Sequence, residues 1–244
     1  MFQTISNFMR VRDIRNKIIF TLLMLIVFRI GTFIPVPNVD ANVLKAVNEF
    51  NIVGFLNTFG GGALANFSIF AMGIMPYITA SIIVQLLQMD VVPKFAEWSK
   101  QGEVGRRKLA QFTRYFTIVL GFIQSFAMSY GFNAMYGGTL IKDTSIGSYL
   151  TIAIVLTAGT AFLLWLAEQI TAYGVGNGIS IIIFAGIVAA MPNAVNQLYA
   201  QKIEGADDQL FLNIVILLLL LLIILAIVVG VIYVQQALRK IPIQ

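Results

Sequence analysis

Few residues in this sequence have the types and spacing that chemistry requires. The 244 residues include no cysteine and no histidine, which excludes thiolate nucleophiles, imidazole bases and the commonest transition-metal ligands. The run AEQITAYGVGNGISIII, residues 167–183, carries three alternate glycines that resemble a phosphate-cradling loop. Such a loop should follow a strand, whereas this run joins two apolar segments. A tight turn is favoured instead, with Asn177 or Ser180 capping the next helix, and we expect no cofactor, no metal and no enzymatic activity.

A second irregular stretch is FGGGALANFSIFAMGIMPYITASIIVQLLQ, residues 59–88, in which three glycines and a proline flank an apolar run. Pro76 lacks a backbone donor and clashes with the carbonyl four residues earlier, so a helix should kink or begin near it. Irregular backbone at membrane depth is tolerated only where protein or a water-filled cavity surrounds it. These residues alone leave two interpretations open: an external loop before a kinked helix, or a re-entrant element inside a helix bundle.

The elements that must position these stretches are membrane-spanning helices. The sequence is 59% hydrophobic and 11% charged, against about 45–50% and 25% in soluble domains. Crossing the hydrocarbon core takes about 20 apolar residues, and the segments that meet this requirement are residues 18–35, 69–89, 115–135, 149–170, 179–198 and 212–235. We therefore predict an all-α polytopic membrane protein with six transmembrane helices.

The basic residues predict the orientation of these helices, because lysine and arginine accumulate in cytoplasmic loops. Twelve of the 16 lysines and arginines fall on one side of the predicted spans: Arg10, Arg12, Arg15, Lys17, Lys94, Lys100, Arg106, Arg107, Lys108, Arg114, Arg239 and Lys240. The opposite loops hold only Lys45, Lys142 and Lys202. The N-terminus is therefore predicted to be cytoplasmic. The basic loop before residue 115 either docks a cytosolic partner or attracts anionic lipid and enforces this topology.

Two charged residues lie inside predicted spans. Arg29 falls inside the first apolar run, where a charge is costly and usually faces protein, a cavity or the interface. We expect it to play a structural role, with its side chain extending toward the external face. Glu168 lies near the cytoplasmic end of the fourth span, and we expect it to be at the interface or paired.

The two irregular stretches together resemble the two signature regions of the SecY protein-translocation channel family. The matching runs are AMGIMPYITASIIVQLL, residues 71–87, and AEQITAYGVGNGISIII, residues 167–183; VFRIGTFIPVP, FGGGAL and ALRKIPIQ also resemble bacterial members. The resemblance implies the N-terminal portion of a channel with ten spans in two inverted halves. Residues 1–198 would form the first half, with a short re-entrant plug helix at about 57–70. Residues 199–244 would supply an external loop, the sixth span and the start of a cytoplasmic loop.

The resemblance also implies roles for individual residues. The pore ring would be Ile74, Ile78, Ile179 and Ile183, and the plug would include Phe59, Gly60, Gly61, Gly62, Ala63 and Leu64. The lateral gate would include Thr79, Gln85 and Gln124, and cytoplasmic partners would dock on Arg106, Arg107, Lys108, Arg239 and Lys240. Each isoleucine pair is spaced i, i+4, which puts its members on one helix face. A narrow aliphatic ring resists ion leakage by dewetting.

The implied function is to pass unfolded secretory polypeptides across the bacterial plasma (inner) membrane and to release transmembrane segments sideways into lipid. The implied partners are SecE and SecG, the SecA ATPase or a ribosome, a preprotein with its signal sequence, membrane lipid, and a companion segment with four further spans. The alternative is a secondary transporter of a small solute, which would also use broken helices at the bilayer midplane. Such a site normally shows charged or convergent polar ligands, whereas the candidate pore positions are isoleucines.

Overall fold

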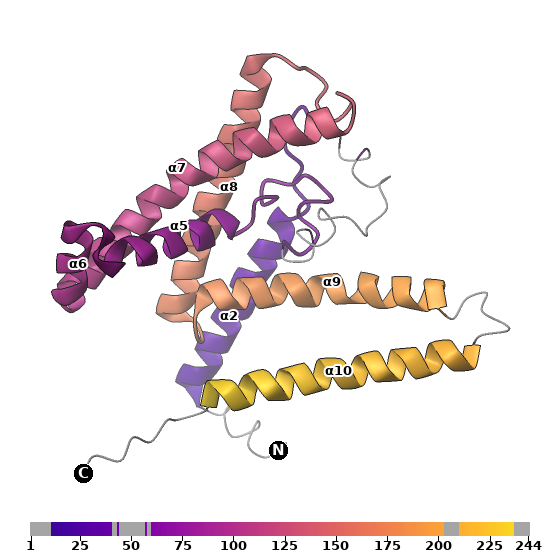
Figure 1. The fold of residues 1–244 in the computed structure, drawn as a ribbon. Coiled ribbons are helices and arrows are strands. Elements are labelled where there is room, and N and C mark those ends of the chain that lie inside the picture. The colour runs from indigo at the N-terminus through magenta and orange to yellow at the C-terminus, as the bar shows by residue number, and fades with distance from the viewer. Residues whose placement is uncertain (1–10, 41–42, 44–56, 58–59, 203–209, 237–244) are drawn as a thin grey trace, which may run out of the picture. The chain divides into compact units, whose positions relative to one another are not determined.

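The computed structural model describes residues 11–40, 43, 57, 60–202 and 210–236. Every regular element in this part of the chain is a helix, as the sequence predicts (Figure 1). The helices are α2 (Arg12–Gly31), α5 (Met75–Leu86), α6 (Pro93–Lys100), α7 (Glu103–Met135), α8 (Ile146–Tyr173), α9 (Gly178–Lys202) and α10 (Leu210–Gln236), with a π-helical turn η1 (Leu87–Val91) after α5. The chain forms two compact units, Met1–Ala190 and Met191–Gln244.

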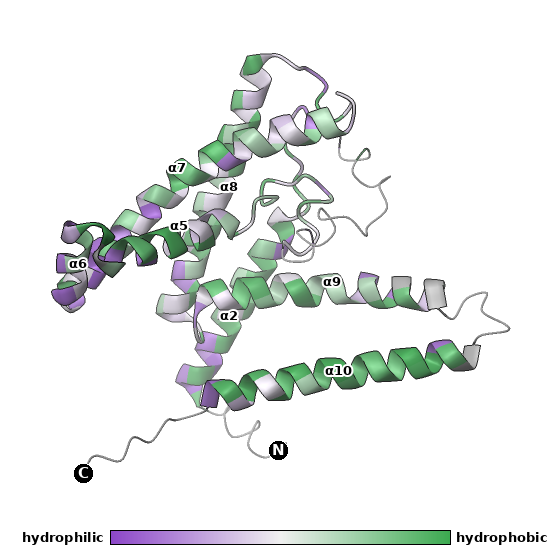
Figure 2. Ribbon diagram, in the orientation of Figure 1, coloured by the Kyte–Doolittle hydropathy of each residue, from purple (hydrophilic) through white to green (hydrophobic). Residues whose placement is uncertain are grey.

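Among the described residues, four helices are long and apolar enough to cross a membrane, namely α7, α8, α9 and α10. The pair α5 and α6, which is bent by 92°, would make a fifth span if the two helices count as one. Helix α2 is not among them, since it carries Arg15, Lys17 and Arg29. Helix α10 is hydrophobic on all sides (Figure 2), a pattern typical of a membrane span. The number of six spans remains a prediction.

The predicted span 69–89 is wrong over its first third. Helix α5 begins only at Met75, with Pro76 in its first turn, because proline is tolerated where no backbone donor is needed. Just before it, Gly73 has φ +55, a left-handed conformation that interrupts a helix. Of the two possibilities for Pro76, the helix therefore begins there. It ends at Leu86 and turns sharply into α6.

The predicted span 115–135 lies within α7, and the helix itself starts earlier, at Glu103. The basic stretch before residue 115 was predicted as a polar connection, and part of it is helical. Lysine, arginine, glutamate and glutamine are good helix formers, so the helix extends beyond the apolar run.

Small and polar residues let α7 approach its neighbours. Helix α7 packs against α5 and α8, and every fourth residue along it is buried: Gly105, Leu109, Thr113, Thr117, Gly121, Ser125, Ser129 and Asn133. Stripes of small residues at this spacing let helix backbones come close in a membrane. The Cβ position at Gly121 lies 3.7 Å from the Cβ of Pro76, so α7 supports the first turn of α5.

Two apolar clusters form the core of the first unit. One consists of Val36, Leu64, Phe67, Ala71, Leu140, Ile141, Tyr149, Ile152 and Leu156. The other consists of Phe28, Ala63, Phe70, Ile74, Leu163, Leu166, Ala167, Ile170 and Ile182. The irregular segment 60–74 contributes to both clusters, so it is part of the core of this unit.

Candidate functional site

The irregular segment 60–74 is a series of turns held by its own hydrogen bonds. The carbonyl of Asn57 accepts from the backbone N–H of Gly62 at 3.1 Å, and its side-chain Oδ1 accepts from that of Ala65 at 2.8 Å. Gly61 and Gly62 have φ values of +63 and +88, which favour glycine over other residues. The predicted short helix at 57–70 is therefore wrong from Gly60 onward, and Phe59 lies outside the described residues.

The far end of this segment pairs with the chain that follows α2. The backbone N–H of Val36 donates to the carbonyl of Phe67 at 3.0 Å, and that of Ile69 donates to the carbonyl of Ile34 at 3.0 Å. These bonds flank an isolated antiparallel bridge between Pro35 and Ser68. Phe67 and Ser68 are fully buried. This end of the segment is thus fixed by both backbone pairing and burial.

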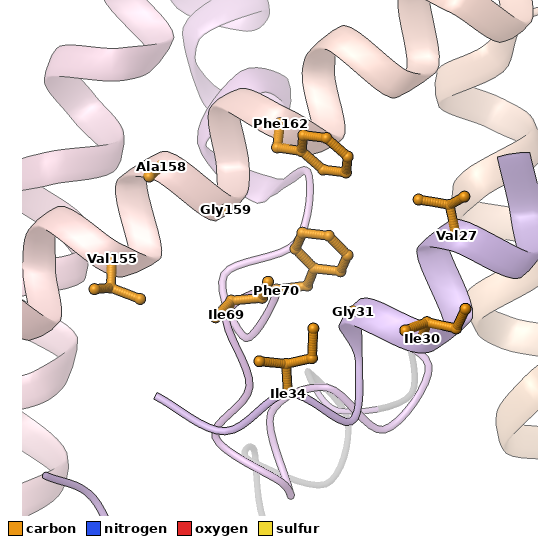
Figure 3. A pocket seen from close by; sticks show the side chains of 10 residues that line it. All are labelled: Val27, Ile30, Gly31, Ile34, Ile69, Phe70, Val155, Ala158, Gly159 and Phe162. Atoms are coloured by element: carbon orange, nitrogen blue, oxygen red, sulfur yellow. The ribbon is translucent and has the colours of Figure 1, made fainter. Parts of the chain in front are cut away.

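Phe70 continues the fixed end into an aromatic stack. Its ring stacks between those of Phe28 and Phe162, with centroids 6.2 and 6.0 Å away. Two glycines make room for this arrangement (Figure 3). A Cβ at Gly31 would lie 1.9 Å from the Phe70 ring, and one at Gly159 would lie 1.8 Å from the carbonyl oxygen of Ile69. An open apolar pocket of about 470 Å³ adjoins them, lined also by Val27, Ile30, Ile34, Val155 and Ala158.

The four predicted ring isoleucines come together from two distant segments. Ile74 is buried, whereas Ile78, Ile179 and Ile183 are partly buried and pack against the same apolar cluster. The backbone N–H of Ile78 donates to the carbonyl of Ile74 at 3.1 Å, which places these residues one helical turn apart. Ala63, one of the predicted plug residues, is fully buried in this cluster. The predicted ring and plug positions are therefore neighbours in the fold.

The tip of the predicted plug also lies against α9. Gly61 is buried, and a Cβ added to it would lie 3.1 Å from the Cα of Gly186. Gly60 and Gly62 on either side are partly buried. Leu64 is buried in the other apolar cluster, together with Phe67. The plug segment therefore contacts α9 at its tip, and the residues just after the tip reach both apolar clusters.

The three predicted gate residues lie on two packed helices. Thr79 on α5 is half-buried, and its hydroxyl donates to the carbonyl of Met75 at 3.1 Å. Gln124 on α7 is half-buried one turn after Gly121, whereas Gln85 is exposed near the end of α5. In the described part of the chain, no hydrogen bond joins these three side chains. Helices α5 and α7 pack against each other.

The glycine-rich run forms the tight turn between α8 and α9 that the sequence predicts. Gly176 has φ +69, and the side-chain Oδ1 of Asn177 accepts from the backbone N–H groups of Ile179 at 3.0 Å and Ser180 at 3.4 Å. The cap is thus Asn177 rather than Ser180. The turn is tied to α2, since the backbone N–H of Val175 donates to the hydroxyl of Thr21 at 3.1 Å.

Two ion pairs form among the described charged residues at the predicted cytoplasmic side. Arg114 Nη2 lies 2.5 Å from Glu168 Oε1, linking α7 to α8 and confirming that Glu168 is paired. Arg107 pairs at 2.7 Å with Glu103 one turn earlier, and both side chains are largely exposed. Arg106 and Lys108 are exposed beside them, whereas the predicted docking residues Arg239 and Lys240 lie outside the described residues.

The sequence did not predict the partners of Arg29. Its Nη1 donates to the carbonyl oxygen of Gly61 at 2.6 Å. Its guanidinium also lies over the ring of Phe33, 4.7 Å from the centroid. The signal in the sequence was a single arginine within an apolar run, which identified an unusual position without indicating what it contacts. Groups of three or more residues able to hold a metal ion are absent from the described residues.

Comparison with known proteins decides the family. The sequence profile of the SecY family matches residues 68–244. This chain belongs to the SecY family. The protein translocase subunits SecY of Bacillus licheniformis and Bacillus subtilis are 75% and 70% identical to it over 244 residues, all of this chain and 57% of each relative. The chain thus spans a little over half the length of these SecY relatives.

Two solved structures share the fold of this SecY chain. One, described as the structure of a protein conducting channel, has a TM-score of 0.50 at 21% identity and covers 79% of this chain and 39% of its own. The other is Sec61 in the canine ribosome-channel complex from the endoplasmic reticulum. It has a TM-score of 0.51 at 20% identity, and the match covers 96% of this chain and 50% of the Sec61 chain. Family and apolar helices together make the chain part of a multi-pass membrane protein.

Proposed function

We propose that this chain forms the N-terminal part of the central pore subunit of the Sec translocon. The complete channel passes unfolded secretory polypeptides across the membrane and releases transmembrane segments sideways into lipid. The protein acts as a channel and not as an enzyme. Its 57% coverage of the SecY relatives fits six spans, with four more supplied by the rest of the channel.

The observation that carries this proposal is the common position of the four isoleucines. Ile74, Ile78, Ile179 and Ile183 gather at one apolar cluster, and the buried plug residue Ala63 belongs to it. In the proposed closed channel, the isoleucines form a ring and the plug segment lies against it. Aliphatic side chains offer ions and water no hydrogen bonds, so the ring prevents leakage while still closing around an extended polypeptide.

The irregular backbone of segment 60–74 supports the same proposal. Non-helical backbone in a membrane protein must be surrounded by protein or a water-filled cavity, and this segment contributes buried side chains to both clusters. We propose that the part around Gly60–Leu64 is the plug. Helix α5, with Thr79 and Gln85, and helix α7, with Gln124, would supply this half of the lateral gate.

The proposed partners follow from the family. SecE and SecG would complete the membrane complex, and the SecA ATPase or a ribosome would dock on the cytoplasmic side near the exposed Arg106, Arg107 and Lys108. Arg239 and Lys240 would belong to the same docking face. The substrate is an unfolded preprotein with its signal sequence. The protein would reside in the bacterial plasma (inner) membrane with a cytoplasmic N-terminus, as the distribution of basic residues predicts.

The test is crosslinking of a stalled preprotein to the proposed ring. Cysteines replacing Ile78 or Ile183 in the full-length channel should form adducts with a preprotein arrested during translocation. A secondary transporter would instead show saturable uptake of a small solute without a preprotein. The described part of the chain does not favour that alternative, because an apolar cluster surrounds the isoleucines.

A further inference from the structure

We propose that Arg29 latches the tip of the plug in the closed channel, and that the moving part of the plug ends before Phe67. This inference rests on the proposed function, because it assigns a retaining contact to the segment proposed there as the plug. It depends on two sets of contacts, one at the tip and one at the base of segment 60–70.

At the tip, a cation from α2 binds the plug backbone. Arg29 Nη1 donates to the carbonyl oxygen of Gly61 at 2.6 Å, and hydrogen bonds from an ionised donor are shorter and stronger than neutral ones. The guanidinium is also placed over Phe33, which favours a fixed orientation of its donor groups. Gly61 is buried on its other side against Gly186. The tip is thus held between α2 and α9.

The contact is strong enough to retain the tip but suited to release. In the described residues no carboxylate pairs with Arg29, so its partners are a carbonyl dipole and an aromatic face. Such a contact is replaced by water or a lipid phosphate more easily than a buried ion pair, whose separation leaves two unpaired charges. A charge this close to the hydrocarbon is costly and marks a functional position. Arg29 therefore has the properties of a reversible latch.

At the base, the chain is held by contacts of a different kind. Residues 67–69 pair with residues 34–36 through two backbone hydrogen bonds of 3.0 Å. Phe70 is stacked between two rings, and its ring occupies the space that a side chain at position 31 would take. None of these contacts involves Arg29. Release of the latch should therefore free residues 60–66 while the base stays in place, which makes the moving part shorter than the predicted 57–70.

The experiment measures the accessibility of single cysteines on each side of this boundary. The probes are Leu64→Cys in the moving part and Ser68→Cys in the base, both at buried positions. They are placed in the full-length channel, assembled in membranes, with any cysteine outside this sequence replaced. A water-soluble maleimide is supplied to both sides of the membrane, and labelling rates are compared between Arg29→Gln, Arg29→Lys and unchanged Arg29. Arg15→Gln, an exposed arginine on the same helix, is the matched control.

We expect Arg29→Gln to raise the labelling rate at position 64 at least about fivefold, since hydrogen bonds to charged groups exceed neutral ones in strength. Position 68 should stay protected, Arg29→Lys should keep most of the protection, and Arg15→Gln should change neither rate. An unchanged rate at position 64 would overturn the latch, and an equal rise at both positions would overturn the boundary by showing general loosening. Labelling does not require polypeptide transport. The labelling rates would therefore still test the latch if the protein proved not to transport polypeptides.

Discussion

Gly159 on α8 lies so close to Ile69 that a Cβ at position 159 would stand 1.8 Å from the carbonyl oxygen of Ile69. The contact joins α8 to the fixed base of segment 60–74, just before α5 begins. Because the partner is a backbone atom, no side-chain rotation can relieve the overlap. Segment 60–74 can therefore take its observed position only because residue 159 has no side chain.

Gly159→Ala should destabilise the protein by about 2 kcal/mol or more, because overpacking forces the backbone to shift. The matched control is Gly131→Ala on α7, where an added Cβ meets nothing within 4 Å. There the better helix propensity of alanine should be neutral or stabilising by about 0.5–1 kcal/mol. Thermal unfolding of the full-length protein in detergent measures the stability change of each variant. Equal midpoints for the two variants would contradict the close approach.

The ion pair between Arg114 and Glu168 should contribute modestly to the packing of α7 on α8. The two side chains are 51% and 37% exposed, so solvent screens the pair and we expect a coupling energy of about 0.5–1 kcal/mol. A double-mutant cycle with Arg114→Gln and Glu168→Gln measures it from unfolding midpoints. The same cycle on Arg107 and Glu103, which are 80% and 79% exposed, is the control. A larger coupling for that exposed pair would show that the first pair adds nothing specific.

The start of α8 should depend on pH through Asp143. The pKa of Asp143 is lowered because its carboxylate accepts hydrogen bonds from the backbone N–H of Ser145, the hydroxyl of Ser148 and the hydroxyl of Ser145. The ionised form therefore stabilises this turn above the pKa of the unfolded chain. That contribution is lost as the pH falls through the lowered pKa of the folded state.

The measurement is hydrogen exchange of the first turn of α8 as the pH is lowered, corrected for the intrinsic exchange rate. Protection should decrease under acidic conditions in the unchanged protein. In Asp143→Asn, which cannot ionise, the same amides should show no such pH dependence. An identical acid response in both proteins would assign the effect to another group.

The sequence could predict the helices but only part of what positions the site. The lengths of the apolar runs predicted the bounds of α8, α9 and α10 to within a few residues, because a membrane span needs little more than hydrophobicity. The start of α5 could not be found that way, because Ile69, Phe70 and Ala71 are as apolar as a helix interior. The backbone at residues 67–69 is instead set by pairing with residues 34–36, a contact between segments far apart in the sequence.

For individual residues too, the sequence predicts local geometry but not contacts between distant segments. The cap at Asn177 and the turn at Gly176 could be predicted, because both depend on local backbone geometry. The grouping of four isoleucines required the family resemblance, since isoleucines at helical spacing occur on many apolar faces. The contact from Arg29 to Gly61 could not be predicted at all, because it depends on how a non-helical segment folds back against α2.

In the proposed channel, the isoleucine cluster is the constriction through which a polypeptide passes. Disulfide or bifunctional crosslinking of an arrested preprotein to single cysteines in the full-length channel tests this role. The test positions are Ile78 and Ile183. The controls are Ala80, which is fully buried on α5, and Val119, which is exposed on α7.

We expect adducts at positions 78 and 183, and these should form only when the preprotein is arrested within the channel. Little or no adduct should form at positions 80 and 119, and release of the arrested chain should abolish the products at 78 and 183. Absence of adducts at both isoleucine positions, while a cysteine at the cytoplasmic side such as Val104→Cys still reacts with the same preprotein, would contradict the claim.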